Sequence, residues 1–237
     1  MFKKIIAACA LVASTSFAAW DVFPILPGGQ GQVKAAVGYT DQDPLTTLES
    51  VLGARFSLTD WLELSLQFDY LMFTHVNGDD VELDGPALLN PGIRFQLSPA
   101  FSIYGDMFVS LDDELTGSDY LTYDFGVQHT SVFGFLAWGS DLGLQMNTGN
   151  DLVVFKLADE MDLLLGAFAP LVGFDFYFAT EFSDETANGY EFYFGAKFST
   201  SQTLMLEFTV RFRDGELFEK GIYDDPTLFE FDVFYNF

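Results

Sequence analysis

The feature that most constrains this chain is an alternation of apolar and polar side chains, which recurs in segments of about ten residues. Between Leu62 and Met72 every even-numbered position is apolar, and most odd-numbered positions are polar. Neighbouring side chains of a β-strand point to opposite faces, so each segment predicts a strand with one apolar and one polar face. The chain is therefore predicted to be all-β, with further such strands at 48–58, 93–98, 121–128, 174–182, 190–198 and 204–213.

The connections between these strands alternate between long and short. Short ones are expected at 59–60, 98–100, 130–131, 168–170 and 199–203, and longer polar ones at 40–47, 74–86, 112–119, from 147 to about 160, 183–189 and 214–226. This order predicts an up-and-down arrangement of about twelve antiparallel strands. Ten or fourteen strands are also compatible, because 151–168 fits either one bent strand or a strand with a long turn. Between Phe133 and Met146 the apolar parity changes, which predicts a β-bulge.

The composition argues against both a disordered chain and a helical membrane protein. The formal net charge is -25, yet 49% of the residues are hydrophobic and 17% are aromatic. Disordered acidic chains lack aromatic residues. The longest nearly uncharged apolar run, 163–174, is shorter than the roughly 20 residues that a membrane-spanning helix needs. Long strands with aromatic apolar faces favour a closed transmembrane β-barrel over a soluble β-sandwich.

The first eighteen residues have the pattern of a cleaved signal peptide. Lys3 and Lys4 precede a short apolar run, and Ser16-Phe17-Ala18 supplies the small residues at a cleavage site. We therefore expect a signal peptide at 1–18, a flexible periplasmic lead-in at 19–31 and an outer-membrane β-barrel at 32–237. The only cysteine, Cys9, would leave with the signal, which excludes disulfides and thiolate metal sites from the mature chain.

The carboxyl terminus carries a second targeting pattern. Its apolar residues fall on one parity and end at the last position of the sequence: Phe231, Val233, Tyr235 and Phe237. This strand resembles the terminal signal of bacterial outer-membrane proteins. The resemblance implies an outer-membrane location and recognition by the barrel-assembly machinery. Both chain termini are then expected in the periplasm, because short turns lie on that side and longer loops are extracellular.

The polar parity of the strands is expected to face the barrel interior. Its charged members are the candidate pore-lining residues: Glu49, Arg55, Glu63, Asp69, Arg94, Asp106, Asp124, Asp175, Glu181, Glu191, Lys197, Glu207, Arg211, Arg213, Glu230 and Asp232, with Asp141 on the same parity. Four tyrosines share this parity: Tyr104, Tyr120, Tyr177 and Tyr193. Buried charges must be paired or hydrated, and the acids here outnumber the bases. The interior is therefore predicted to be at least partly wet.

These patterns support three hypotheses about function. The leading one is a passive channel for small polar or cationic solutes. The second is a structural or surface-interaction barrel whose interior charges form a stabilising plug. The expected surroundings are outer-membrane lipid and lipopolysaccharide, with the acidic loops bridged to phosphates by divalent cations, and the negative charge disfavours nucleic acid. The oligomeric state does not follow from the sequence.

The third hypothesis is a lipid hydrolase, and it depends on His129 and Ser131. This H-x-S spacing resembles that of the outer-membrane phospholipase family, in which the histidine activates a serine nucleophile. The asparagines and glycine of that family's motif are absent here, and the pair falls at an expected periplasmic turn. The acidic stretch 77–84 lacks the ligand order of a calcium loop. We therefore expect no enzymatic activity, no cofactor and no metal site.

Overall fold

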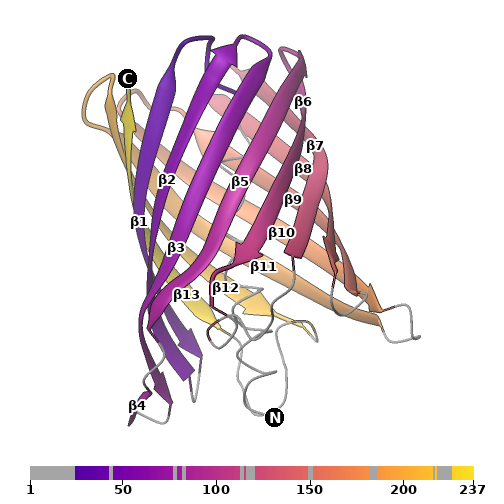
Figure 1. Ribbon diagram of the computed structural model, residues 1–237. Helices are drawn as coiled ribbons and strands as arrows, with labels where there is room; N and C mark the ends of the chain where they lie inside the picture. The colour runs from indigo at the N-terminus through magenta and orange to yellow at the C-terminus, as the bar shows by residue number, and fades with distance from the viewer. Residues whose placement is uncertain are drawn as a thin grey trace.

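The computed structural model describes residues 25–42, 45–76, 79–81, 84–112, 115, 121–148, 152–181, 186–215, 217 and 226–237. These residues form one antiparallel sheet that closes on itself into a tall barrel (Figure 1). Its strands are β1 (Gly31–Gln42), β2 (Leu45–Thr59), β3 (Leu62–Val76), β4 (Asp79–Val81), β5 (Gly85–Ser98), β6 (Phe101–Ser110), β7 (Leu121–Phe133), β8 (Leu136–Asn147), β9 (Leu152–Leu163), β10 (Phe168–Glu181), β11 (Thr186–Ser199), β12 (Leu204–Asp214) and β13 (Thr227–Asn236).

The barrel closes where the first strand pairs with the last. β1 pairs with β2 on one side and with β13 on the other, in a register that runs from Gln32↔Asn236 to Asp41↔Thr227. β4 is a three-residue extension paired to β3, so the closed wall has twelve strands, as predicted. Closure matters in a membrane because each unpaired backbone group there costs several kcal/mol, and a closed barrel has no free edge.

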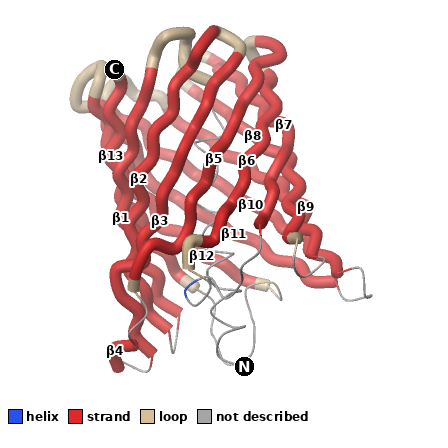
Figure 2. Tube along the Cα trace, viewed as in Figure 1, coloured by secondary structure: helices blue, strands red, loops and turns tan. Residues whose placement is uncertain are grey.

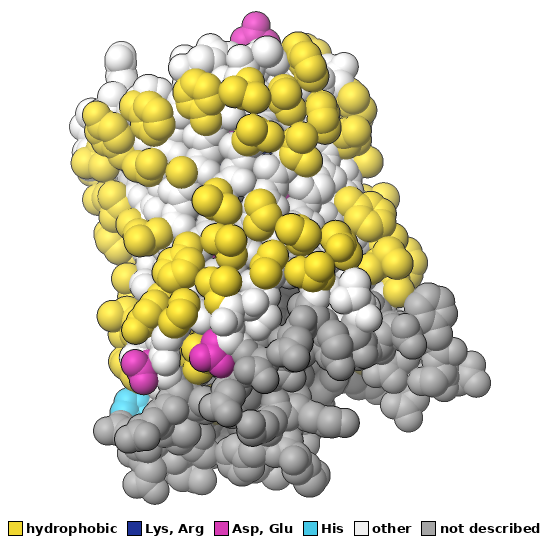
Figure 3. Space-filling model, in the orientation of Figure 1, with side chains coloured by type: hydrophobic (Ala, Val, Ile, Leu, Met, Phe, Trp, Pro, Cys, Tyr) yellow, Lys and Arg dark blue, Asp and Glu magenta, His cyan; other side chains and the backbone are white. Residues whose placement is uncertain are grey.

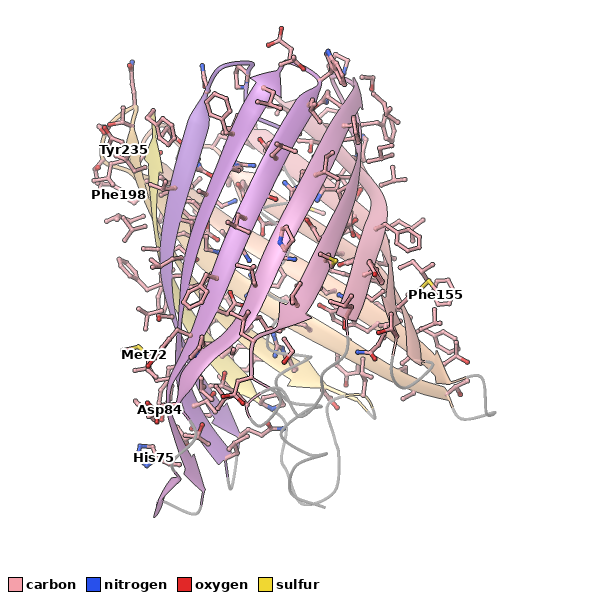
Figure 4. The ribbon with its side chains drawn as sticks, viewed as in Figure 1. Met72, His75, Asp84, Phe155, Phe198 and Tyr235 are labelled. Atoms are coloured by element: carbon pink, nitrogen blue, oxygen red, sulfur yellow. The ribbon has the colours of Figure 1, made fainter. Side chains whose placement is uncertain are left out.

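The outer surface of the barrel is apolar and aromatic. On β10, Phe174, Phe176 and Phe178 are exposed, whereas Asp175 and Tyr177 between them are buried. Apolar side chains gather in bands on the visible outer wall (Figure 3), and Phe155, Phe198 and Tyr235 point away from the barrel (Figure 4). The predicted separation into an apolar outer face and a polar inner face is thus present.

One end of the barrel carries the short connections and the carboxyl terminus (Figure 2). We call this the turn end, and the opposite end the loop end. The described amino-terminal residues also lie at the turn end. There Gly28 N donates to Asp60 Oδ1 at 2.8 Å, and Gly29 N donates to Ser57 O at 2.7 Å. The part of the lead-in from residue 25 on is therefore attached to the β2–β3 turn rather than free. The expected signal peptide, 1–18, lies outside the described residues.

The turn between β7 and β8 corrects two predictions. The chain reverses at Gly134 and Phe135, where Gly134 has a φ of 64°, and not at 130–131. The change of parity between Phe133 and Met146 is caused by this reversal, so the predicted β-bulge there is wrong. Even-numbered residues face inward before this turn, on β7, and odd-numbered residues face inward after it, on β8. A bulge would change the pattern in the same way.

The strand β9 corrects a third prediction. Residues 152–163 form a full strand, so the expected long loop from 147 to about 160 is mostly strand. The next turn lies at 164–167, and 168–170 begin β10 instead of forming a turn. The predicted loop 40–47 is likewise too long, since β1 continues to Gln42 and β2 begins at Leu45. Among the described residues no helix is long and apolar enough to cross a bilayer.

Candidate functional site

The barrel interior brings together basic and acidic side chains from around the wall. In the part of the chain that the structure describes, every Lys and Arg faces inward: Lys34, Arg55, Arg94, Lys156, Lys197, Arg211 and Arg213. The predicted interior acids are brought in with them: Glu49, Glu63, Asp69, Asp106, Asp124, Asp141, Asp175, Glu191, Glu207, Glu230 and Asp232. The side chain of Glu181 and the whole of Tyr120 lie outside the described residues. Whether these residues line a solute pathway stays a prediction.

The first interior cluster lies at the turn end on β2, β3 and β5. Glu63 Oε1 is 3.6 Å from Arg55 Nη1 and 4.0 Å from Arg94 Nη1. Its other oxygen accepts a hydrogen bond of 2.9 Å from the backbone N–H of Leu26 and one of 3.2 Å from Ser57 Oγ. Because one of the donors to Oε2 is the backbone N–H of Leu26, Glu63 ties the amino-terminal segment to the barrel wall.

A second cluster crosses the closing seam from β1 to β11. Lys34 Nζ lies 3.1 Å from Asp232 and 3.5 Å from Glu230. Arg211 joins Glu230, at 3.3 Å, to Glu191, at 2.7 Å, and Arg213 also pairs with Glu191. These pairs connect four neighbouring strands through their inner faces. The network links residues that lie far apart in the sequence, because β1 and β13 meet only when the barrel closes.

A third cluster joins β11 to β9 across β10. Lys197 Nζ lies 2.7 Å from Glu160 and 3.0 Å from Asp162. The hydroxyl of Tyr193 donates to Glu160 at 2.9 Å, and the Tyr193 ring lies against the guanidinium of Arg211, 4.2 Å from centroid to Cζ. Gly173 on β10 leaves the space that this tyrosine needs, since a Cβ there would collide with the ring.

A fourth cluster surrounds Tyr104 on β6. Its hydroxyl lies 3.1 Å from Asp141 Oδ2 and 3.3 Å from Asp124 Oδ1. Lys156 Nζ is 3.8 Å from Asp141 Oδ2, and Gln145 donates to Asp124 at 3.2 Å. Tyr104, Tyr177 and Tyr193 all point inward as predicted by parity, and each is hydrogen-bonded to an interior carboxylate.

Several interior carboxylate oxygens have no hydrogen-bond donor among the described residues. They include Oε1 of Glu49, Oδ1 of Asp69, Oδ2 of Asp106 and Oδ1 of Asp175. An ionised carboxylate that is buried without a donor is strongly disfavoured, so each of these groups is hydrated, bound to a cation or protonated. The interior therefore combines a paired network with a set of buried acids that lack a hydrogen-bond donor among the described residues.

Sequence reasoning missed four members of this interior. Lys34 is absent from the predicted set, although Gln32, Lys34 and Ala36 on β1 alternate with apolar residues. Lys156, Glu160 and Asp162 were missed because their strand was interpreted as a loop. The alternation was nevertheless present, because the even-numbered residues of 154–162 form the inward face. Asp159, which faces outward beside Glu160, obscured it by placing two acids next to each other.

The His129–Ser131 pair lies within β7, on its outward face, and not in a turn. Ser131 Oγ is 2.9 Å from His129 Nε2. Among the described residues the other contacts of the imidazole are the rings of Phe101 and Trp138. A serine hydrolase also needs a group that orients the histidine and donors for the oxyanion. The pair therefore supplies one element of hydrolytic chemistry and not the rest.

The terminal residues predicted as a targeting signal are placed on the last strand as expected. Phe231 and Tyr235 are exposed on the outer face of β13, and Val233 lies between them on the same face. Phe237 follows the strand at the turn end and exchanges backbone hydrogen bonds with Gly31. This strand also forms one side of the closing seam, where it pairs with β1.

A closed up-and-down barrel with an aromatic exterior and a charged interior defines the class of outer-membrane-type β-barrel proteins. The chain is similar to an outer membrane channel from Pseudomonas putida F1, with a TM-score of 0.66, 14% identity, and coverage of 92% of this chain and 99% of that chain. It is similar to the translocator domain of the autotransporter NalP from Neisseria meningitidis, with a TM-score of 0.61, 12% identity, and coverage of 98% and 96%.

A third similar structure is the NanC porin, with a TM-score of 0.58, 8% identity, and coverage of 86% of this chain and 98% of that chain. At these identities the likeness shows a shared fold. No protein-family model matches the sequence, and no curated protein matches it either.

Proposed function

We propose that this protein is a passive outer-membrane channel for small polar or cationic solutes. The observation that carries the proposal is the set of interior carboxylates, among them Glu49, Asp69 and Asp106, whose oxygens lack donors in the described residues. Water and mobile cations are the partners that such oxygens accept when the groups are ionised. An interior hydrated in this way offers a hydrophilic path, and its excess of acids attracts cations and repels anions.

Ion conduction through the purified protein in a planar bilayer tests this proposal. Under a potassium chloride gradient we expect a reversal potential of the sign produced by cation selectivity. Asp69→Asn and Asp106→Asn should each lower the selectivity, because each removes an interior negative charge. Asp41→Asn is the matched control, since Asp41 is exposed at the loop end of β1. A protein that folds but carries no current above background would refute the channel.

The orientation of the barrel is part of the proposal. We place the turn end in the periplasm and the loop end outside the cell, as is general for bacterial barrels. Thr148 is exposed at the loop end and Ser201 at the turn end. A membrane-impermeant thiol reagent added to intact cells should label Thr148→Cys and spare Ser201→Cys. Labelling of Ser201→Cys alone would show the opposite orientation.

The second candidate function is a structural or surface role, performed by a barrel that is closed at its turn end. It is favoured by the amino-terminal segment, where Ile25 is buried and Leu26 N–H is bound to the interior residue Glu63. Leu26→Pro removes that N–H, so a segment that blocks the mouth should loosen and the conductance should rise. Pro27→Ala, the adjacent control, keeps the bond. An unchanged conductance in Leu26→Pro would show that this contact closes nothing.

We further propose that acidic residues at the loop end bind lipopolysaccharide through divalent cations. Asp84 is exposed there, and Asp214 lies near the end of β12 (Figure 4 shows Asp84). Carboxylates and phosphates are both oxygen ligands that magnesium and calcium accept. Lipopolysaccharide retained by the purified protein should fall on addition of a chelator, and it should fall on Asp84→Asn as well. If neither the chelator nor Asp84→Asn changes the amount of lipopolysaccharide retained, the cation bridge is contradicted.

A further inference from the structure

One carboxylate on the outer wall lies where a membrane barrel ordinarily has apolar residues. Asp159 on β9 faces outward, and its neighbours on that face, Leu157 and Met161, are 45% and 46% exposed. Phe174, its partner on β10, is also exposed. Among the described residues no other acid faces outward from the middle of a strand. Asp159 therefore lies among apolar residues on this face.

Asp159 is held in place on this face by a tryptophan. Trp138 Nε1 donates to Asp159 Oδ1 at 3.0 Å, from the outward face of β8. A charge on the lipid face of a barrel is destabilising, and a single neutral donor compensates it only in part. The described Lys and Arg side chains all face inward, so none of them balances this charge from within the same chain. The geometry leaves a place for a basic group from outside.

The basic group that the same surface offers is a histidine two strands away. On the outer face His129 is opposite Ser140, and Ser140 is opposite Asp159, so the three lie in a row across β7, β8 and β9. The imidazole is positioned by Phe101 and Trp138, with ring centroids 4.9 Å and 5.1 Å away. The row therefore contains a base at one end, a small residue in the middle and an acid at the other end.

We propose that the outer face of β7–β9 is the contact surface of a two-fold symmetric homodimer in the membrane. A two-fold interface brings the same surface of both copies together, so that a residue on one side of the axis meets a residue from the other side. With the axis along the membrane normal and beside Ser140, His129 of each copy lies on the same side of the axis as Asp159 of the partner subunit. The acid and the base that are separate in one chain become neighbours twice in the dimer.

The occupant is a second copy because the surface is complementary to itself. It carries one base and one acid on either side of a small residue, which is the arrangement that a two-fold axis requires. A zwitterionic lipid headgroup would also satisfy both charges, but Leu163 and Phe133 continue the apolar face beyond the row toward the turn end. The row is therefore flanked by apolar residues on its turn-end side.

Cysteine crosslinking tests the interface directly. In the full-length chain with Cys9→Ala as background, Ser140→Cys places a thiol beside the proposed axis. Oxidation of the protein in its membrane should convert most of it to a species of twice the monomer mass. Ala54→Cys is the matched control, because Ala54 is a small outward-facing residue on β2, away from this surface. Equal crosslinking of the two variants would overturn the proposal.

Exchange of the two charges distinguishes a specific contact from a folding defect. Asp159→His alone and His129→Asp alone each place like residues against one another, so crosslinking through Ser140→Cys should fall to the level of the control. The double variant restores an acid opposite a base and should recover crosslinking. Heat-modifiable gel migration verifies that each variant is folded. A folded double variant that fails to recover, or a monomer that retains phospholipid instead, would overturn the dimer.

Discussion

The backbones of Phe237 and Gly31 exchange two hydrogen bonds, each of 2.9 Å, at the turn end of the seam that closes the barrel. The ring of Phe237 also covers Gly31, so that any side chain at this glycine would collide with it. A glycine in a strand often marks such a close approach. The last residue thus pairs with the first residue of β1 through both its backbone and its ring.

Replacement of Phe237 by alanine should weaken the seam. Loss of a cross-strand contact costs about 1 kcal/mol, and Phe237 is in addition the end of the strand that we propose the assembly machinery recognises. We expect a lower folded fraction in the membrane, measured by heat-modifiable gel migration. Phe229→Ala is the control, because Phe229 packs on Tyr39 across the same seam near the loop end. Equal losses in both variants would show no special role for the terminal position.

A second prediction concerns the space above Gly143. A Cβ at this position would lie 2.6 Å from the hydroxyl of Tyr104, which is 3.1 Å from Asp141. Gly143→Ala should push the hydroxyl away and destabilise the barrel by about 1–3 kcal/mol, the usual cost of overpacking. Urea unfolding in detergent or lipid measures the free energy. Gly105→Ala is the control, since its nearest heavy atom, on Ile93, is 3.9 Å away.

A second substitution tests whether the hydroxyl of Tyr104 causes the loss of stability in Gly143→Ala. In a Tyr104→Phe background the hydroxyl is gone, so Gly143→Ala should cost much less than in the native chain. Coupling between two substitutions reports a direct contact when each removes only that contact. Additive effects would mean that the alanine acts through the strand backbone and not through Tyr104.

The sequence predicted well which residues face the barrel interior. It did not predict which of those residues contact one another. Parity is a local property, so it places Glu191 and Asp232 on the inner face from their neighbours alone. The contact of Lys34 with Asp232 depends on the register between β1 and β13, which is fixed only when the sheet closes with its stagger. No local pattern contains that information.

The predicted strand limits were wrong where acidic residues occupy both faces of a strand. The segment Ala158-Asp159-Glu160 places two acids in succession, which is typical of a loop, whereas in the structure Glu160 faces inward and Asp159 faces outward. A lipid-facing acid is an exception to the alternation of apolar outward and polar inward residues in a membrane barrel. The outward orientation of Asp159 therefore explains both the misplaced loop and the surface from which the dimer is inferred.

A third prediction concerns Lys197, which lies between Glu160 and Asp162. Lys197→Met leaves both acids without their cation, and removal of one partner from a buried ion pair typically costs about 3–5 kcal/mol. Addition of Glu160→Gln and Asp162→Asn should recover much of the loss, because no uncompensated charge then remains. Unfolding free energies of the single and triple variants measure this. A triple variant less stable than Lys197→Met would contradict the explanation.

A fourth prediction uses Lys156 to locate the solute path. Lys156 projects from β9 toward the interior acids, with Nζ 3.8 Å from Asp141 and within electrostatic reach of Asp175. If solutes pass this point, Lys156→Gln should make the channel more cation-selective, since it removes a positive charge from the path and exposes acids to the solute. The reversal potential under a salt gradient should move closer to the equilibrium potential of the cation.

Two further variants make this result specific. Lys156→Arg keeps the charge and should leave the reversal potential unchanged, whereas Lys156→Glu reverses the charge and should shift it further than Lys156→Gln. The three variants thus order the selectivity by the charge at one position. A conducting channel in which all three give the native reversal potential would place the solute path away from β9 and toward the opposite wall. The unpartnered oxygens of Glu49 and Asp69 on β2 and β3 would then be the acids that solutes meet.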